Sequence, residues 1–104
     1  MRSLYFIGTS QDDLRAFPDD AKRSAGWDLR RVQSGLDPTD WKAMPTVGAG
    51  VREIRIRGQA GAFRVFYVVA SEAAVYVLHA FQKKTQKTSQ ADLERGRSRF
   101  KLIQ

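Results

Sequence analysis

The chain has 104 residues, of which 42% are hydrophobic, enough to form one folded domain and too many for a disordered chain. It contains no cysteine and one histidine, which excludes disulfides and argues against a structural zinc site. The formal net charge of +7 at pH 7 favours an anionic partner, and nucleic acid is the leading class.

No segment reaches the roughly 18 consecutive apolar residues of a membrane span. The apolar run at the N-terminus is also too short for the core of a signal peptide. No linker, repeat or low-complexity tract interrupts the sequence. We therefore expect a single domain over residues 1–104 that is cytoplasmic and has no membrane partner.

The first half of the chain predicts one strand and a helical region. Residues 4–7 (LYFI) form a short apolar run that is typical of a strand. Apolar residues then recur at three- and four-residue steps over positions 14–32, which predicts one helical face. Pro18 lies inside this pattern, so it either kinks one helix or begins a second one. Trp27 and Trp41 are interpreted as packing residues.

The second half predicts a meander of strands followed by a helix. Residues 36–50 are rich in proline and glycine and are expected to form a structured loop. Three strand-like runs follow, at residues 51–57, 62–69 and 74–81, with connections short enough for antiparallel hairpins. A helix is expected over residues 89–100. This order predicts an α+β fold with an antiparallel sheet and helices packed on one face.

The positive charge is confined to the second half of the chain. Residues 1–50 carry seven Lys/Arg and seven Asp/Glu, so their charges cancel. Residues 51–104 carry eleven Lys/Arg and four Asp/Glu, which accounts for the whole excess. A segregated charge indicates an anionic partner more strongly than a uniformly basic surface does.

Strand alternation predicts where the arginines lie. Arg55 and Arg57 are two residues apart and should share one face of their strand. Arg64 is the one charged residue of the next strand and has no acidic neighbour in sequence, so it should either be paired with an acid from elsewhere or lie on an open sheet face. Lys83 and Lys84 follow directly on the third strand, which should hold them at the rim of that face.

The same alternation places two aromatic side chains. His79 and Phe81 are expected to share a face with Val75 and Val77. The face of the sheet that carries no helix is then the candidate site, with guanidinium groups from two adjacent strands. His79 is open to two interpretations, as a hydrogen-bonded core residue or as a proton carrier.

These residues are compatible with metal-free cleavage of RNA. The RNA 2′-hydroxyl supplies the nucleophile, so a protein needs only to orient the backbone, neutralise the phosphorane and move protons. Arg55 and Arg64 are suited to bidentate phosphate binding, and a lysine crowded by cations is suited to proton transfer. The catalytic candidates are Arg55, Arg64, Lys84 and His79. The candidate RNA-binding residues are Arg57, Lys83, Lys87 and Phe81, the last as a stacking ring.

Four blocks of the sequence resemble a known family. They are residues 10–14 (SQDDL), 48–55 (GAGVREIR), 63–67 (FRVFY) and 77–88 (VLHAFQKKTQKT). Their order and spacing resemble the phage-derived, HigB-like branch of the RelE/ParE toxin superfamily, which belongs to type II toxin–antitoxin systems. The last block is the most specific, because few unrelated folds end a strand with this His-x-Phe-x-Lys-Lys-Thr pattern.

The resemblance implies a RelE-like microbial RNase fold, with a curved antiparallel sheet that carries helices on one side. It implies a metal-independent mRNA endoribonuclease (mRNA interferase) that acts on the ribosome, inhibits translation and needs no cofactor. The implied partners are the ribosome, mRNA and a cognate antitoxin of helix-turn-helix type. Arg55, Arg64, Lys83 and Lys84 match the basic positions of the family pattern, and His79 matches its strand histidine. Two alternatives remain open: a ParE-like toxin that poisons gyrase, and a non-catalytic, basic, phage-related module that binds nucleic acid.

Overall fold

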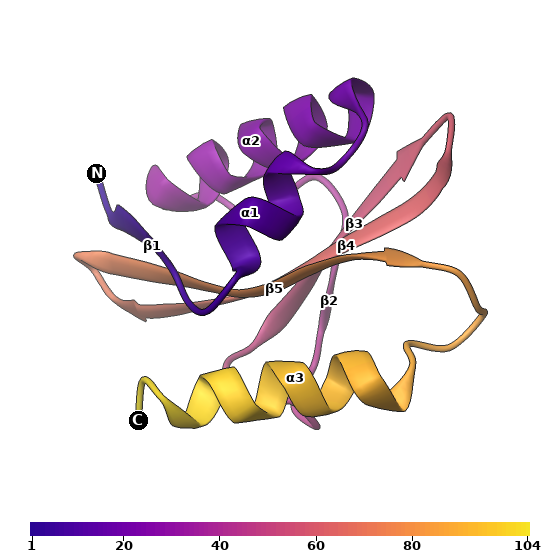
Figure 1. Cartoon of the computed structure of the whole chain (residues 1–104). Coiled ribbons are helices and arrows are strands. Elements are labelled where there is room, and N and C mark those ends of the chain that lie inside the picture. The colour runs from indigo at the N-terminus through magenta and orange to yellow at the C-terminus, as the bar shows by residue number, and fades with distance from the viewer.

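Five strands and three helices make up the fold in the computed structural model, which describes residues 1–104 (Figure 1). In chain order these elements are β1 (Ser3–Phe6), α1 (Ser10–Arg15), α2 (Asp19–Gln33), β2 (Trp41–Ala43), β3 (Arg52–Gly58), β4 (Gly61–Ser71), β5 (Ala74–Lys83) and α3 (Gln90–Lys101). The strands form one sheet in the order β1-β5-β4-β3-β2. This confirms the predicted α+β class.

The predicted sheet needs two corrections at its edges. The antiparallel meander of β3, β4 and β5 is confirmed, but β1 runs parallel to β5, so the sheet is mixed. The segment predicted as a loop contains β2, a short strand that pairs antiparallel with β3. Pro18 lies between two helices, at the position directly before α2 and without a capping hydrogen bond from its side chain. Of the two alternatives for Pro18, the start of a second helix is therefore the correct one.

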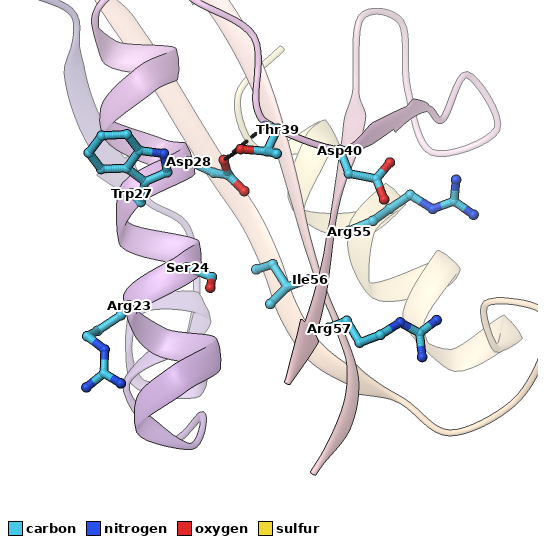
Figure 2. A pocket seen from close by; sticks show the side chains of 9 residues that line it. All are labelled: Arg23, Ser24, Trp27, Asp28, Thr39, Asp40, Arg55, Ile56 and Arg57. Carbon is cyan, nitrogen blue, oxygen red and sulfur yellow. Dashed lines mark hydrogen bonds between the residues drawn. The ribbon is translucent and has the colours of Figure 1, made fainter. Parts of the chain in front are cut away.

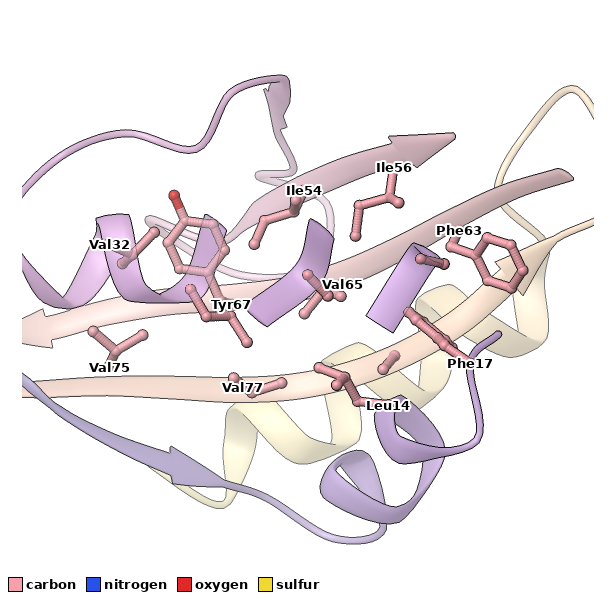
Figure 3. Packing of buried hydrophobic residues seen from close by; sticks show 14 residues of the cluster. Leu14, Phe17, Val32, Ile54, Ile56, Phe63, Val65, Tyr67, Val75 and Val77 are labelled. Atoms are coloured by element: carbon pink, nitrogen blue, oxygen red, sulfur yellow. The ribbon is translucent and has the colours of Figure 1, made fainter. Parts of the chain in front are cut away.

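The helices cover both faces of the sheet, and not one face as predicted. Helices α1 and α2 lie on one side and α3 lies on the other (Figure 1). The first side holds the larger core, in which residues such as Leu14 and Phe17 pack on Val65 and Val77 (Figure 3). The second side holds a smaller core around Phe66. Because β4 and β5 are apolar on both faces, a helix is needed on each side to keep them from water.

A bulge in β5 changes which of its side chains share a face. Phe66 and Tyr67 are adjacent in β4, but they pair with His79 and Val77, which are two residues apart in β5. Leu78 is therefore left without a partner in β4. An extra residue of this kind shifts the alternation by one. Val75 and Val77 therefore belong to the core under α1 and α2, whereas Phe81 belongs to the core under α3. The prediction that His79 and Phe81 share a face with the two valines was wrong for this reason.

Helix α3 approaches the sheet closely at Gly96. A Cβ atom at this position would lie 2.8 Å from Phe66 Cδ2 and 2.9 Å from Val47 Cγ1. We expect Gly96→Ala to lower the free energy of unfolding by about 1–3 kcal/mol, because Phe66 is fully buried and has no room to move.

The matched control is Gly26→Ala, at a helical glycine of α2 that has no atom within 4 Å of the added Cβ. This change should raise the free energy of unfolding by about 0.5–1 kcal/mol, the intrinsic helix preference of alanine. Urea unfolding followed by circular dichroism measures both. A stabilising Gly96→Ala would contradict the close packing of α3.

Candidate functional site

Four cationic side chains from three neighbouring strands share one region of the sheet. The register places Arg55 of β3 opposite Arg64 of β4, and it places Ala62 between Arg57 and Lys83. Directly opposed residues of an antiparallel pair point to the same face, so all four side chains lie on the side of α3. We call Arg55, Arg57, Arg64 and Lys83 the cationic cluster.

Arg64 is the buried member of the cluster, with 7% of its surface exposed. Its Nη1 donates a hydrogen bond to the carbonyl of Phe63 at 2.9 Å, and its Nε lies 3.6 Å from Glu53 Oε1. Burial lowers the pKa of Arg64, and Arg55 adds to this, while Glu53 opposes it. The guanidinium stays charged, because arginine does not lose its proton in proteins. Arg64 has no acidic neighbour along its own strand, and the structure pairs it with Glu53 of the neighbouring strand β3.

Glu53 is the residue that sequence reasoning missed. It is 2% exposed, and its second carboxylate oxygen, Oε2, accepts a hydrogen bond from Thr88 Oγ1 at 3.1 Å. One carboxylate therefore ties Arg64 to the segment that joins β5 to α3. The signal was present in the alternation of β3, where Glu53 lies on the face of Arg55. The register with β4, which shows which cation lies beside it, comes only from the tertiary structure.

The three lysines at the end of β5 differ in environment. Lys83 is half-buried at the last position of the strand, and burial together with the nearby charge of Arg64 lowers the pKa of its ammonium group. Lys84 and Lys87 are exposed in the segment between β5 and α3. Thr85 Oγ1 donates to the carbonyl of Lys87, and the bond from Thr88 to Glu53 holds the end of this segment against the sheet.

His79 and Phe81 lie next to the cationic cluster but are covered. His79 is 4% exposed, and its Nε2 lies 2.7 Å from Asp92 Oδ1 of α3. Its ring stacks on Phe81 with a centroid distance of 4.7 Å and an interplanar angle of 18°. The amide of Asp92 also donates to the Oγ of Ser89, the N-cap of α3. His79 thus attaches the first turn of α3 to β5.

The burial of His79 predicts a pH-dependent stability. Burial lowers its pKa below the ordinary value of 6.5, and the opposing effect of Asp92 does not offset this. The unfolded chain then binds the proton more readily than the folded chain, so stability is complete above pH 6.5 and falls as the pH drops through the folded pKa.

We expect the free energy of unfolding to decrease as the pH falls below 6.5 in the wild type, and to decrease less in His79→Gln. Urea titrations of both proteins over this range measure the difference between their free energies of unfolding. Carboxylates that titrate in both proteins contribute to both pH profiles, so their effect cancels in this difference. The charged groups that face His79 are Asp92, Arg95 and Arg99 of α3, and all three are unchanged in the variant. Parallel pH profiles for the two proteins would show that His79 does not control this effect.

Two hollows meet at the edge of β3. One, of about 260 Å³, is bordered by Arg64 and contains part of the cationic cluster. The other, of about 350 Å³, lies between β3 and α2 and is bordered by Trp27 (Figure 2). Both are lined by Asp40, Arg55, Ile56 and Arg57. Trp27 is 63% exposed, so its interpretation as a packing residue was wrong.

A mixed five-stranded sheet with three helices and a cationic cluster on one face defines a small basic α+β domain that is compatible with the RelE-like fold. Residues 12–101 match the family described as phage derived protein Gp49-like (DUF891), and the chain belongs to this family. The family is part of the RelE/HigB-like toxin superfamily. No curated protein matches the chain. None of its helices is long and apolar enough to cross a membrane.

Proposed function

We propose that this protein is the toxin of a type II toxin–antitoxin pair and that it cleaves mRNA on the ribosome without a metal ion. The observation that carries the proposal is the cationic cluster, in which Arg55, Arg64 and Lys83 come from three adjacent strands around the buried Glu53. Membership of a toxin family supports a cognate antitoxin as partner, for which we propose the helix-turn-helix type. Action on ribosomes places the protein in the cytoplasm.

In the proposed reaction the 2′-hydroxyl loses its proton to a solvent water as its oxygen attacks the adjacent phosphorus, and the bond from phosphorus to the 5′ oxygen breaks. Arg55 and Arg64 hold the phosphate and neutralise the charge that develops on it. Lys83 gives its proton to the leaving 5′ oxygen, a role suited to an ammonium group whose pKa is lowered by burial and by Arg64. Lys84 contacts the same phosphate from the segment that follows β5.

The remaining candidates have supporting roles in this proposal. Arg57 and Lys87 are exposed and contact the RNA backbone on either side of the reacting phosphate. His79 acts as a positioning residue, because its bond to Asp92 holds α3 next to the cluster. Phe81 is 8% exposed and packs between His79 and Phe66, so it offers an edge and not a free face to a base.

Inducible expression in bacteria tests the activity. The expected result is an arrest of growth and translation, with new 5′ ends inside mRNA mapped by primer extension. Co-expression of the gene that neighbours the toxin gene should relieve the arrest if it encodes the antitoxin. A toxic protein that leaves mRNA intact would contradict the proposal.

The two alternatives give different readouts in the same cells. A gyrase poison produces DNA breaks and an SOS response with intact mRNA. A non-catalytic module permits normal growth, and its purified form binds RNA with an affinity that falls steeply with salt but yields no cleavage. The placement of two arginines inside strands, on one sheet face, favours phosphate chemistry over the protein–protein contact that a gyrase poison needs.

A further inference from the structure

Trp27 is an exposed tryptophan on a charged surface. It lies in the middle of α2, and 63% of its surface is open to solvent. Tryptophan is usually largely buried, because its indole ring carries a large apolar area. The Trp41 ring, by comparison, is covered by Arg52, whose guanidinium carbon lies 3.9 Å from the ring centroid. No aromatic or cationic partner of this kind is found for Trp27.

The cleft beside Trp27 is mainly polar, and its charged lining residues are three arginines, the buried Asp28 and the exposed Asp40. Only two of its nine lining residues, Trp27 and Ile56, are hydrophobic, and three are arginines. Arg23 is four residues before Trp27, so the two side chains are neighbours on one face of α2. Asp28 contributes little charge to the opening, because it is buried and its Oδ1 accepts hydrogen bonds from both the amide and the hydroxyl of Thr39 (Figure 2).

The cleft is continuous with the cationic cluster. Figure 2 shows Ile56 directed towards α2, and Arg55 and Arg57 directed away from it, on the other side of β3. The same two arginines border the hollow that holds Arg64. Strand β2 ends its pairing with β3 at Ile54, and the amide of Arg55 still donates to the carbonyl of Asp40. Beyond Arg55 no strand is paired with this edge of β3, where the two hollows meet.

We propose that Trp27 forms a stacking subsite for one base of the RNA substrate, at a nucleotide that flanks the cleaved one. The strand would run from the cationic cluster around the open edge of β3, with Arg57 and Arg23 on its phosphates and the base on the indole ring. An aromatic ring beside cationic groups is the combination that binds single-stranded nucleic acid without strong sequence preference. The mixture of three arginines and one exposed ring suits RNA better than an apolar protein surface. This inference rests on the proposed function.

Fluorescence tests the subsite, because the chain has only two tryptophans. Trp41→Phe leaves Trp27 as the sole reporter, and Trp27→Phe leaves Trp41. The probe is a short single-stranded RNA with 2′-O-methyl groups, which cannot be cleaved. Quenching should occur in Trp41→Phe and be much weaker in Trp27→Phe. Absence of quenching in Trp41→Phe would overturn the subsite.

Affinity for the same RNA provides the second readout. Trp27→Ala should weaken binding roughly 5- to 100-fold, the loss expected for one stacked base, while Trp27→Phe retains most of the affinity. Leu36→Ala is the matched control, since Leu36 is another exposed large apolar residue that lies outside the cleft. Unchanged RNA binding by Trp27→Ala would overturn the proposal. The proposal is also overturned if this variant binds RNA normally and loses only its binding to the antitoxin, because Trp27 would then be an antitoxin contact.

The test of the stacking subsite can fail independently of the test of mRNA cleavage. Quenching and weakened binding without any cleavage of mRNA would support the subsite and contradict the nuclease. Cleavage of mRNA by the wild type, with Trp27→Ala binding RNA as tightly as the wild type, would support the nuclease and contradict the subsite.

Discussion

Replacement of Glu53 by alanine is expected to lower the free energy of unfolding by about 3–5 kcal/mol, the typical cost of removing one partner from a buried ion pair. Glu53 is 2% exposed and Arg64 is 7% exposed. Without the carboxylate, the guanidinium of Arg64 stays buried beside Arg55 with no ion-pair partner, and only the exposed Asp40 still opposes its charge. The hydroxyl of Thr88 loses its acceptor in the same step.

Urea unfolding measures this loss of stability. Two further variants test whether it comes from the unpaired charge of Arg64. Glu94→Ala removes an exposed acid from α3 and should change the free energy of unfolding by less than about 0.5 kcal/mol. The double variant Glu53→Leu/Arg64→Met replaces the pair with apolar side chains and should recover much of the lost stability, because no unpaired charge remains. A Glu53→Ala protein as stable as the Glu94→Ala control would show that the pair contributes nothing.

Lys83→Met is expected to reduce the rate of mRNA cleavage by roughly 10²–10⁴-fold, the usual contribution of a general acid. Lys83 is suited to such a test because no ion pair or hydrogen bond of its side chain is lost with it. Purified ribosomes, a defined mRNA and single-turnover conditions measure the rate. Arg55→Gln should also slow the reaction, by roughly 10²–10³-fold, through loss of one phosphate contact.

The control for both changes is Lys101→Met, which removes the same charge from the exposed end of α3. It should reduce cleavage far less, since it alters only long-range attraction. The pH profile supplies a second criterion. A general acid works while it is protonated, so the wild-type rate should decline as the pH rises through the lowered pKa of Lys83, and this decline should be absent in Lys83→Met. Equal rates for the variants at positions 83 and 101 would exclude Lys83 as the acid.

The local pattern predicted most of the secondary structure, for an identifiable reason. The helical spacing over residues 14–32 and the alternating strands of the second half both describe how one side chain relates to its near neighbours. The bounds of β3, β4 and β5 accordingly lie close to the predicted runs. The segment that forms β2 was missed because its three residues lie among prolines and glycines and become a strand only by pairing with β3.

The candidate site was predicted less completely. Alternation alone places Arg55 and Arg57 together, and the structure agrees with this placement. It also misplaced His79 and Phe81, because a bulge at Leu78 has no reliable signal in one sequence and inverts every position after it. Roles within the site stay proposals that the variants above test.

Composition and short-range periodicity were sufficient to predict the α+β class, the strand meander and the concentration of positive charge in the second half of the chain, because none of these depends on contacts between distant residues. The tertiary structure decided the rest. The pairing of Arg64 with Glu53, the cover that α3 gives His79 and the exposure of Trp27 all depend on strand register and on which helix faces which side of the sheet. Such contacts join residues far apart in the chain, and short-range sequence patterns do not reveal them.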